Sequence, residues 1–429
     1  MRTLLFVTFL LFGQAAHAAT NILLVIADDM GVDASPCHAE GSDLVRMPNL
    51  TQLCRTGMVF NNAYAAPTCS PTRATIMTGR YGFRTGIGGA IRPTNTVTLA
   101  DTEISLFDVL NETTDYASAI IGKWHLSSNA TDYAHPSRLG VTHFFGIFSG
   151  GIKDYYDWTA VEADTTGNRN VQIDTYATTE ISNRAIDWIA GQSTPWFLWL
   201  AYNAPHAPFH VPPADPHAFG NLTTDTQAIR RNPQAHYFAA LEALDRELGR
   251  VLASMDTDTR ANTVVVFMGD NGTPGQIRRS SGNADRAKGS IYDGGTRVPV
   301  VFSGPGVKAG RTDALMNSTD LYATILALAG ASSAAEDSID QNPVLRGAAQ
   351  GPRKYAYIEH FSDGEIRGKG SLGWAVRDAR YKLVRRKGHP EELYDLSEDV
   401  DERRDLLSGS ATTTGIAKRL RNVRDGLTQ

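Results

Sequence analysis

Four short apolar runs constrain the fold of this chain more than any other feature. They span residues 21–27, 116–121, 196–202 and 263–268. Their apolar character is nearly continuous, which is typical of strands that are covered on both faces in the parallel sheet of an α/β protein. A helical repeat of apolar residues from Tyr237 to Val251 predicts a long amphipathic helix, whose apolar face we expect to serve the core and nothing more.

Polar side chains follow two of these runs directly. Asp28 and Asp29 come after the first run, and Asp270 and Asn271 come after the fourth. Ligands of open α/β sheets bind at the carboxyl ends of the strands, so these residues are candidates for one shared site. Three carboxylates and an amide oxygen suit calcium or magnesium and do not suit zinc. Adjacent acidic residues are also common in solvated turns, which is the alternative for Asp28 and Asp29.

The other two runs end in cationic and imidazole side chains. Lys123 and His125 are two residues apart in an extended stretch, so they point the same way and could hold an oxyanion and move a proton. His206 lies between two prolines, which would aim its ring rigidly. A solvated lysine and a histidine with a purely structural hydrogen bond are the alternatives.

The stretch from Cys69 to Arg80 predicts an anion site. Pro71 and Gly79 bracket a short helix, and Cys69 lies just ahead of its N-terminus. Backbone N–H groups and the helix dipole favour anions there, and Arg73 adds a permanent cation. Cys69 could be a thiolate nucleophile with a lowered pKa, or only a buried residue at a helix cap.

The order Cys69-x-Pro71-x-Arg73, followed by Thr78-Gly79-Arg80, resembles the signature of the type I sulfatases. Gly-Lys-Trp-His at 122–125, His-x-Pro at 206–208 and the segment 288–299 also resemble segments of that family. The family commonly has Glu where this chain has Asp293, a conservative change. Six segments follow the family's order along nearly the whole chain.

This resemblance implies the fold and the cofactors. The fold would be alkaline-phosphatase-like α/β, with a large mixed sheet sandwiched by helices and a smaller C-terminal antiparallel sheet. Cys69 would be converted to formylglycine by a maturation enzyme. One divalent cation, calcium in preference to magnesium, would be held by the predicted oxygen ligands Asp28, Asp29, Asp270 and Asn271.

The resemblance also implies roles in the hydrolysis of sulfate monoesters. Arg73 and Lys123 would stabilise the formylglycine diol and the sulfate, and His125 would act as the base that expels sulfate. His206 and Lys288 would stabilise and protonate the leaving alcohol. A phosphonate or phosphate ester hydrolase on the same fold is one alternative function, and an inactive sulfate- or glycan-binding relative is another.

The chain divides into three predicted parts. Residues 1–18 have the charged start, apolar run and small-x-small end of a signal peptide cleaved after Ala18, and we expect a periplasmic or secreted enzyme. Residues 19–335 would form the catalytic domain and residues 336–429 a C-terminal subdomain. We further expect a capped helix over 101–110, irregular structure over 127–170 that shapes the substrate pocket, and a terminal helix over 413–427.

Composition limits the remaining possibilities. The formal net charge of −5, with no strongly basic segment, gives no nucleic-acid footprint. No run after the leader is apolar and long enough for stable membrane insertion.

If Cys69 is modified, Cys37 and Cys54 remain as an even pair that could form a disulfide in an oxidising compartment. No carbohydrate-binding module is evident, so small aryl or sugar sulfates are favoured as substrates over internal cleavage of a polymer.

Overall fold

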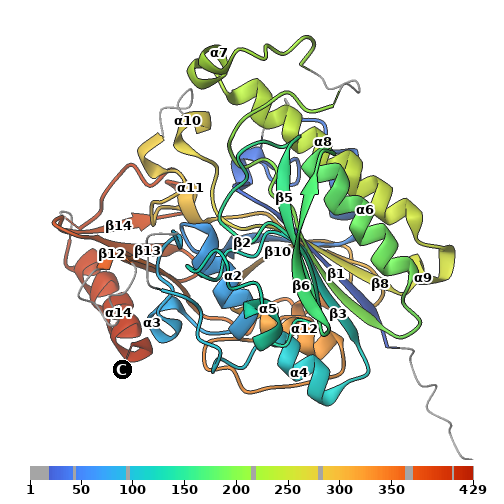
Figure 1. The fold of residues 1–429 in the computed structure, drawn as a ribbon. Coiled ribbons are helices and arrows are strands. Elements are labelled where there is room, and N and C mark those ends of the chain that lie inside the picture. Colours follow the sequence, from blue (N-terminus) through green and yellow to red (C-terminus); the bar gives the residue numbers. More distant parts are fainter. Residues whose placement is uncertain are drawn as a thin grey trace, which may run out of the picture.

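A ten-stranded mixed sheet lies between two layers of helices in the computed structural model (Figure 1). The structure describes residues 19–41, 45–92, 97–213, 219–278, 284–362, 371–407 and 410–428. The predicted signal peptide, residues 1–18, lies outside the described residues. The large sheet and the smaller C-terminal sheet confirm the predicted fold class.

The four apolar runs form the centre of the large sheet. Strand β1 (Asn21–Ala27) pairs in parallel with β7 (Trp196–Ala201) on one side and β8 (Thr263–Gly269) on the other. Strand β3 (Ala117–Gly122) pairs in parallel with β7. Every residue of β1, β7 and β8 is buried, as their continuous apolar sequences predict. The carboxyl ends of all four strands therefore meet at one edge of the sheet.

Six further strands extend this sheet on both sides. The strand order is β10-β2-β9-β8-β1-β7-β3-β4-β5-β6. On one side lie β2 (Met58–Tyr64), β9 (Val300–Ser303) and β10 (Gly310–Asn317), in which β9 runs antiparallel to its neighbours β2 and β8. On the other side lie β4 (His143–Gly146), β5 (Trp158–Asp164) and β6 (Gly167–Ile173), the last three strands of the order.

Two separate apolar cores cover the two faces of the sheet. One contains residues of α1 (Pro48–Thr56), α6 (Ala177–Ala190) and α8 (Gln234–Ser254). The other contains residues of α2 (Cys69–Thr78), α4 (Leu106–Thr113) and α12 (Asp320–Leu328). The short helices are α3 (Gly82–Thr85), α5 (His135–Arg138), α7 (Thr226–Arg231), α9 (Thr257–Ala261), α10 (Gly275–Arg278), α11 (Asp293–Thr296) and α13 (Asn342–Leu345), with 3-10 turns at Val32–Ala34 and Ala284–Arg286.

Two predicted elements differ from the structure. The helix expected over 101–110 is α4, which begins at Leu106 because Ser105 and Asp108 form a reciprocal capping box. The region 127–170, expected to be irregular, contains α5, strands β4 and β5, and the start of β6. Strand β6 lies at the sheet edge and only Ile173 in it is buried, so its sequence has no apolar signal to read.

A four-stranded antiparallel sheet follows the large sheet in the chain. It consists of β11 (Ala356–Phe361), β12 (Ser371–Arg377), β13 (Tyr381–Arg386) and β14 (Glu391–Asp395), and α14 (Ala411–Leu427) packs against β12 and β13. The domain boundary placed near residue 335 stays a prediction.

A buried charge cluster joins the two sheets. Lys382 of β13 is fully buried, and its Nζ donates to Asp293 Oδ1 at 2.7 Å and lies 2.8 Å from Glu402 Oε1. The hydroxyl of Tyr64, at the end of β2, donates to the other Asp293 oxygen at 2.9 Å. Because a buried charge is costly without a partner, this cluster fixes the C-terminal sheet against the large one.

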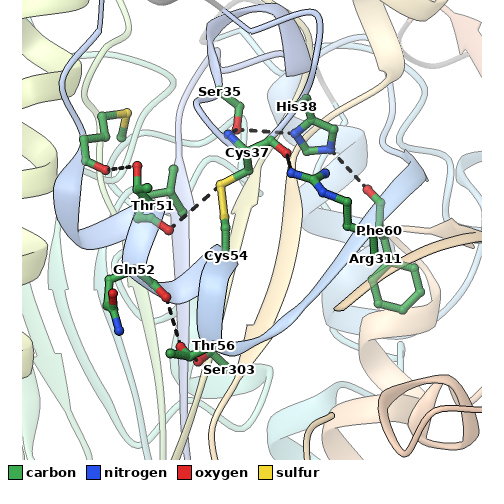
Figure 2. The surroundings of a disulfide bond; sticks show 12 residues. Ser35, Cys37, His38, Thr51, Gln52, Cys54, Thr56, Phe60, Ser303 and Arg311 are labelled. Atoms are coloured by element: carbon green, nitrogen blue, oxygen red, sulfur yellow. Dashed lines mark hydrogen bonds between the residues drawn. A yellow bond between two sulfur atoms is a disulfide. The ribbon is translucent and has the colours of Figure 1, made fainter. Parts of the chain in front are cut away.

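A disulfide joins Cys37 to Cys54, the pair that the sequence analysis left available for one (Figure 2). Cys54 belongs to α1, and Cys37 lies in the loop that follows β1. Arg311 of β10 donates to the backbone oxygen of Cys37 at 2.6 Å, and the neighbouring His38 contacts the backbone oxygen of Phe60 at 3.2 Å. The bond therefore fixes a loop that begins at the carboxyl end of β1.

Among the described residues, no helix is long and apolar enough to cross a membrane.

We predict that the double variant Cys37→Ser/Cys54→Ser loses about 3 kcal/mol of unfolding free energy, since the closed loop of 17 residues restricts the unfolded chain. Denaturant titration measures this loss. Reductant should lower the stability of the parent protein and leave the double variant unchanged. A parent protein that is equally stable with and without reductant would contradict the prediction.

Candidate active site

Three carboxylates converge where β1 and β8 end. Asp28, Asp29 and Asp270 are all buried, and the backbone N–H of Asp29 donates to Asp270 Oδ1 at 3.0 Å. The amide of Asn271 donates to Asp29 Oδ1 at 2.8 Å. Asp29 adopts a left-handed conformation with φ of 74°, which is uncommon outside glycine and occurs at functional sites. Residues 241 positions apart in the chain thus share one site.

Three cations neutralise these carboxylates one by one. Lys123 Nζ donates to Asp28 Oδ2 at 2.6 Å, and Arg73 donates to Asp270 Oδ2 at 2.9 Å. Lys288 pairs with Asp29. Burial is the largest single influence on Asp28 and would raise its pKa, but the combined charges around it, that of Lys123 first, hold the pKa below its ordinary value. Burial and the charge of Asp28 raise the pKa of Asp270.

Cys69 lies in the middle of these charges. It is the first residue of α2, with Thr68 as the N-cap, so it sits one position further into the helix than the sequence suggested. Its Sγ is 3.3 Å from Asp28 Oδ1 and 3.7 Å from Lys288 Nζ. Burial and the neighbouring carboxylates raise the pKa of the Cys69 thiol, the opposite of what the thiolate alternative requires.

His125 is arranged as a proton acceptor. Its Nε2 is 2.8 Å from the carbonyl oxygen of Ile91, which can only accept, so Nε2 carries the proton and Nδ1 carries the lone pair. Nδ1 is buried and has no partner among the described residues. Burial and the charge of Lys123 hold the pKa of His125 well below its ordinary value, so the ring is a free base at neutral pH.

His206 presents the opposite ring nitrogen to the site. Its Nδ1 is 2.7 Å from the carbonyl oxygen of Ala207, so Nδ1 carries a proton and Nε2 faces Asp29 Oδ2 at 3.9 Å. The contacts described above link nine of the ten predicted residues, and His125 makes no direct contact with Cys69. The ten are Asp28, Asp29, Cys69, Arg73, Lys123, His125, His206, Asp270, Asn271 and Lys288.

The residues fit a hard divalent cation. Asn271 Oδ1 is buried and has no hydrogen-bond partner in the described part of the chain, and it lies beside three carboxylates. An orphaned buried oxygen in such a setting is a natural metal ligand. A second set also gathers, since ligand atoms of Asp28, Asp29, Cys69 and His206 lie within 4.8 Å of one another. We favour the all-oxygen set because a protonated thiol is a poor ligand.

Two buried tyrosines hold the backbone of this site and were not predicted from sequence. The hydroxyl of Tyr237 in α8 donates to the carbonyl oxygen of Asp29 at 2.8 Å, so the expectation that this helix face serves only the core was wrong. The hydroxyl of Tyr155 donates to the carbonyl oxygens of Asn203 and His206 at 3.0 and 2.7 Å. Apolar periodicity cannot distinguish a tyrosine that fills the core from one whose hydroxyl finds a backbone partner.

The segment after β4 closes the site from one side. A Cβ atom at Gly150 would come within 2.4 Å of His125 Nε2, and one at Gly151 would lie 3.5 Å from His206 Cε1. Glycine thus lets the backbone approach both histidines closely. This agrees with the expectation that residues 127–170 shape the pocket.

Comparisons with known proteins give a consistent set of matches. A family model described as Sulfatase matches residues 20–331, and one described as N-sulphoglucosamine sulphohydrolase, C-terminal, matches residues 286–427. Arylsulfatase G of Rattus norvegicus is 30% identical over 94% of this chain and 86% of its own length. Arylsulfatase A of Homo sapiens is 28% identical with the same coverage. A crystal structure of Ps i-CgsB in complex with k-i-k-neocarrahexaose superposes with a TM-score of 0.78 at 26% identity, covering 96% of this chain and 94% of that one.

We predict that Tyr237→Phe weakens the binding of calcium. The variant removes the hydroxyl that donates to the carbonyl oxygen of Asp29. If calcium then binds tenfold more weakly, the protein loses about 1.4 kcal/mol of calcium-induced stabilisation at saturation. The measurement is the rise in melting temperature on adding calcium to chelator-treated protein.

Tyr202→Phe is the matched control. Tyr202 is also fully buried, and its hydroxyl contacts Ser182 Oγ at 2.7 Å, away from the carboxylates. Both variants should lose some stability without calcium. An equal calcium-induced rise in the two variants would reject the role given to Tyr237.

Proposed function

The chain belongs to the sulfatase family and is a sulfuric ester hydrolase, and we propose that it releases inorganic sulfate from aryl or carbohydrate sulfates with a formylglycine formed from Cys69 as the nucleophile. The observation that carries this proposal is the position of Cys69. Of the three cysteines, it alone is outside the disulfide, and it lies at a helix N-terminus among three neutralised carboxylates.

The cations around Cys69 suit the charge that develops in sulfate transfer. Negative charge on the sulfonyl oxygens needs fixed donors nearby, and preformed electrostatic stabilisation is usually the largest catalytic contribution. Arg73 and Lys123 are both buried and are held by Asp270 and Asp28. We assign them to the sulfate group and to the nucleophile, where they need no reorganisation during the reaction.

His125 and His206 divide the proton transfers. A hydrated formylglycine supplies one hydroxyl to attack sulfur and a second whose deprotonation expels sulfate. His125, whose free Nδ1 is a base at neutral pH, is assigned to take that proton. His206 and Lys288 are assigned to the leaving alcohol, since both reach the Cys69 pocket from the side of Asp29.

A bound calcium ion would polarise a sulfate oxygen and position the nucleophile. Asp28, Asp29, Asp270 and Asn271 would hold it, which the orphaned Asn271 oxygen supports. Magnesium is the second choice, because it demands near-ideal octahedral geometry, whereas calcium accepts flexible coordination by several carboxylate oxygens.

The two alternative functions are not favoured. The matched family model and the named relatives are sulfatases, which disfavours a phosphonate or phosphate ester hydrolase. An inactive binding relative would not need the complete set of paired cations, carboxylates and a free-base histidine described above.

Substrate, location and maturation follow from several sources. The arylsulfatase relatives support an aryl or small sugar sulfate, and the matched complex with a neocarrahexaose supports a sulfated saccharide.

The leader sequence and the disulfide support a periplasmic or secreted enzyme. Conversion of Cys69 requires a formylglycine-generating maturation enzyme in the same host.

We predict that the mature protein is lighter than its encoded mass by the replacement of CH₂SH with CHO, and that this change maps to the peptide containing Pro71 and Arg73. The variant Cys69→Ser offers one hydroxyl instead of two, so it should accept sulfate once and then stall. Intact-mass and peptide mass spectrometry test both outcomes. Sustained turnover by the variant, with its serine unconverted, would overturn the mechanism.

We predict that the loss of activity in His206→Ala and Lys288→Ala depends on the leaving group of the substrate. Loss of a general acid should slow an alkyl or sugar sulfate by about 10²- to 10⁴-fold and 4-nitrophenyl sulfate much less, since nitrophenolate leaves without a proton. Paired kcat/KM values on the two substrates measure the ratio. Asp270→Ala is the comparison, because the metal assignment predicts similar losses on both. Equal losses for His206→Ala on both substrates would remove it from the leaving-group role.

A further inference from the structure

A groove of about 360 Å³ lies beside the candidate active site. The segment 147–153 forms one wall, and the β5–β6 hairpin forms another through Thr159, Asn170 and Gln172. Tyr133, partly buried, packs edge-on against Phe148 at a ring distance of 5.5 Å on the remaining side. None of these residues has a part in the catalytic assignments above.

The groove adjoins the side of the site assigned to the leaving group. Gly151 lines the groove and lies near the ring of His206, since a Cβ atom added at Gly151 would be 3.5 Å from His206 Cε1. Gly150, next to it, lies against His125. A substrate whose leaving oxygen meets His206 would therefore extend its attached unit towards this groove.

The lining combines apolar and aromatic residues with several hydrogen-bonding side chains. Asp157 Oδ1 accepts from Gln172 at 2.6 Å, and Gln172 in turn accepts from Thr159 at 2.9 Å, so a short ordered chain of donors and acceptors faces the groove. Asn170 is exposed at the edge strand. Planar amides, a carboxylate and a partly buried aromatic ring are suited to the hydroxyl groups and the apolar face of a sugar.

Lys153 gives the groove a positive charge that favours anionic ligands. It lines the groove, is exposed, and makes no hydrogen bond or ion pair with any residue that the structure describes. Asp157, a carboxylate that also lines the groove, accepts a hydrogen bond from Gln172 and forms no ion pair with Lys153. An ammonium in the lining that no described residue engages is available for an anionic group on the ligand.

We propose that this groove is a saccharide subsite that binds the sugar unit next to the one losing its sulfate, with Lys153 recognising a sulfate or carboxylate on that neighbouring unit. The inference rests on the proposed function of the adjacent site and narrows its substrate class to sulfated di- or oligosaccharides with a second anionic group. Asn170 would bind the neighbouring sugar whatever its charge.

The test compares Lys153→Met, Asn170→Ala and the control Lys418→Met, which removes an exposed lysine on α14. The substrates are 4-nitrophenyl sulfate, a monosaccharide sulfate, and disaccharides of that sugar with a neutral or a sulfated second unit. Lys153→Met should raise KM about two- to fivefold for the disulfated disaccharide alone, and high salt should erase the difference. Asn170→Ala should raise KM for both disaccharides, and Lys418→Met should change nothing.

Three results would overturn the subsite. One is an unchanged KM for the disulfated disaccharide in Lys153→Met, and another is a parallel rise on 4-nitrophenyl sulfate. The third is a parent enzyme that neither hydrolyses the disaccharides nor is inhibited by them more strongly than by the monosaccharide sulfate. Absence of sulfate release from every substrate would instead reject the proposed function, and calorimetric titration of the disaccharides into each variant would still test the groove.

Discussion

Burial of charge at the carboxyl edge of the large sheet is the constraint on which the rest of the structure depends. Three carboxylates lie within a few residues of strands that have no solvent contact, and each requires a cation because an unpaired buried charge costs several kcal/mol. Arg73, Lys123 and Lys288 meet that requirement from three different parts of the chain. The site is thus held together by the same ion pairs to which we assign its chemistry.

The sequence indicated the centre of the fold because the central strands have a clear apolar pattern. Strands buried on both faces are continuous apolar runs, and the polar residues that follow them must share one edge. The periphery carries no such signal. Strand β6 is exposed along most of its length, and β10 is buried only in its last three residues, so neither shows a period-two pattern. Their places are fixed by pairing with distant strands.

The same distinction applies to the site. Residues that bear charge or a nucleophile stand out in a sequence, and those predicted lie at one site in the structure, although His125 does not contact Cys69 directly. Tyr237 and Tyr155 act through a single hydroxyl on a backbone oxygen, and Gly150 acts through the absence of a side chain. Such contributions depend on which loop lies opposite, and that is a property of the tertiary structure alone.

The distance in sequence between the partners of the site has a consequence for biosynthesis. Cys69 is 2% exposed, and its Sγ contacts Lys288, which lies 219 residues further along the chain. Contacts this far apart form late, because the intervening chain must be present before they can close. The thiol is therefore accessible between its emergence and the docking of β8, and any enzyme that modifies Cys69 must act within that interval. Faster folding would shorten this interval, so the proposed conversion of Cys69 and the folding of the sheet would be linked in time.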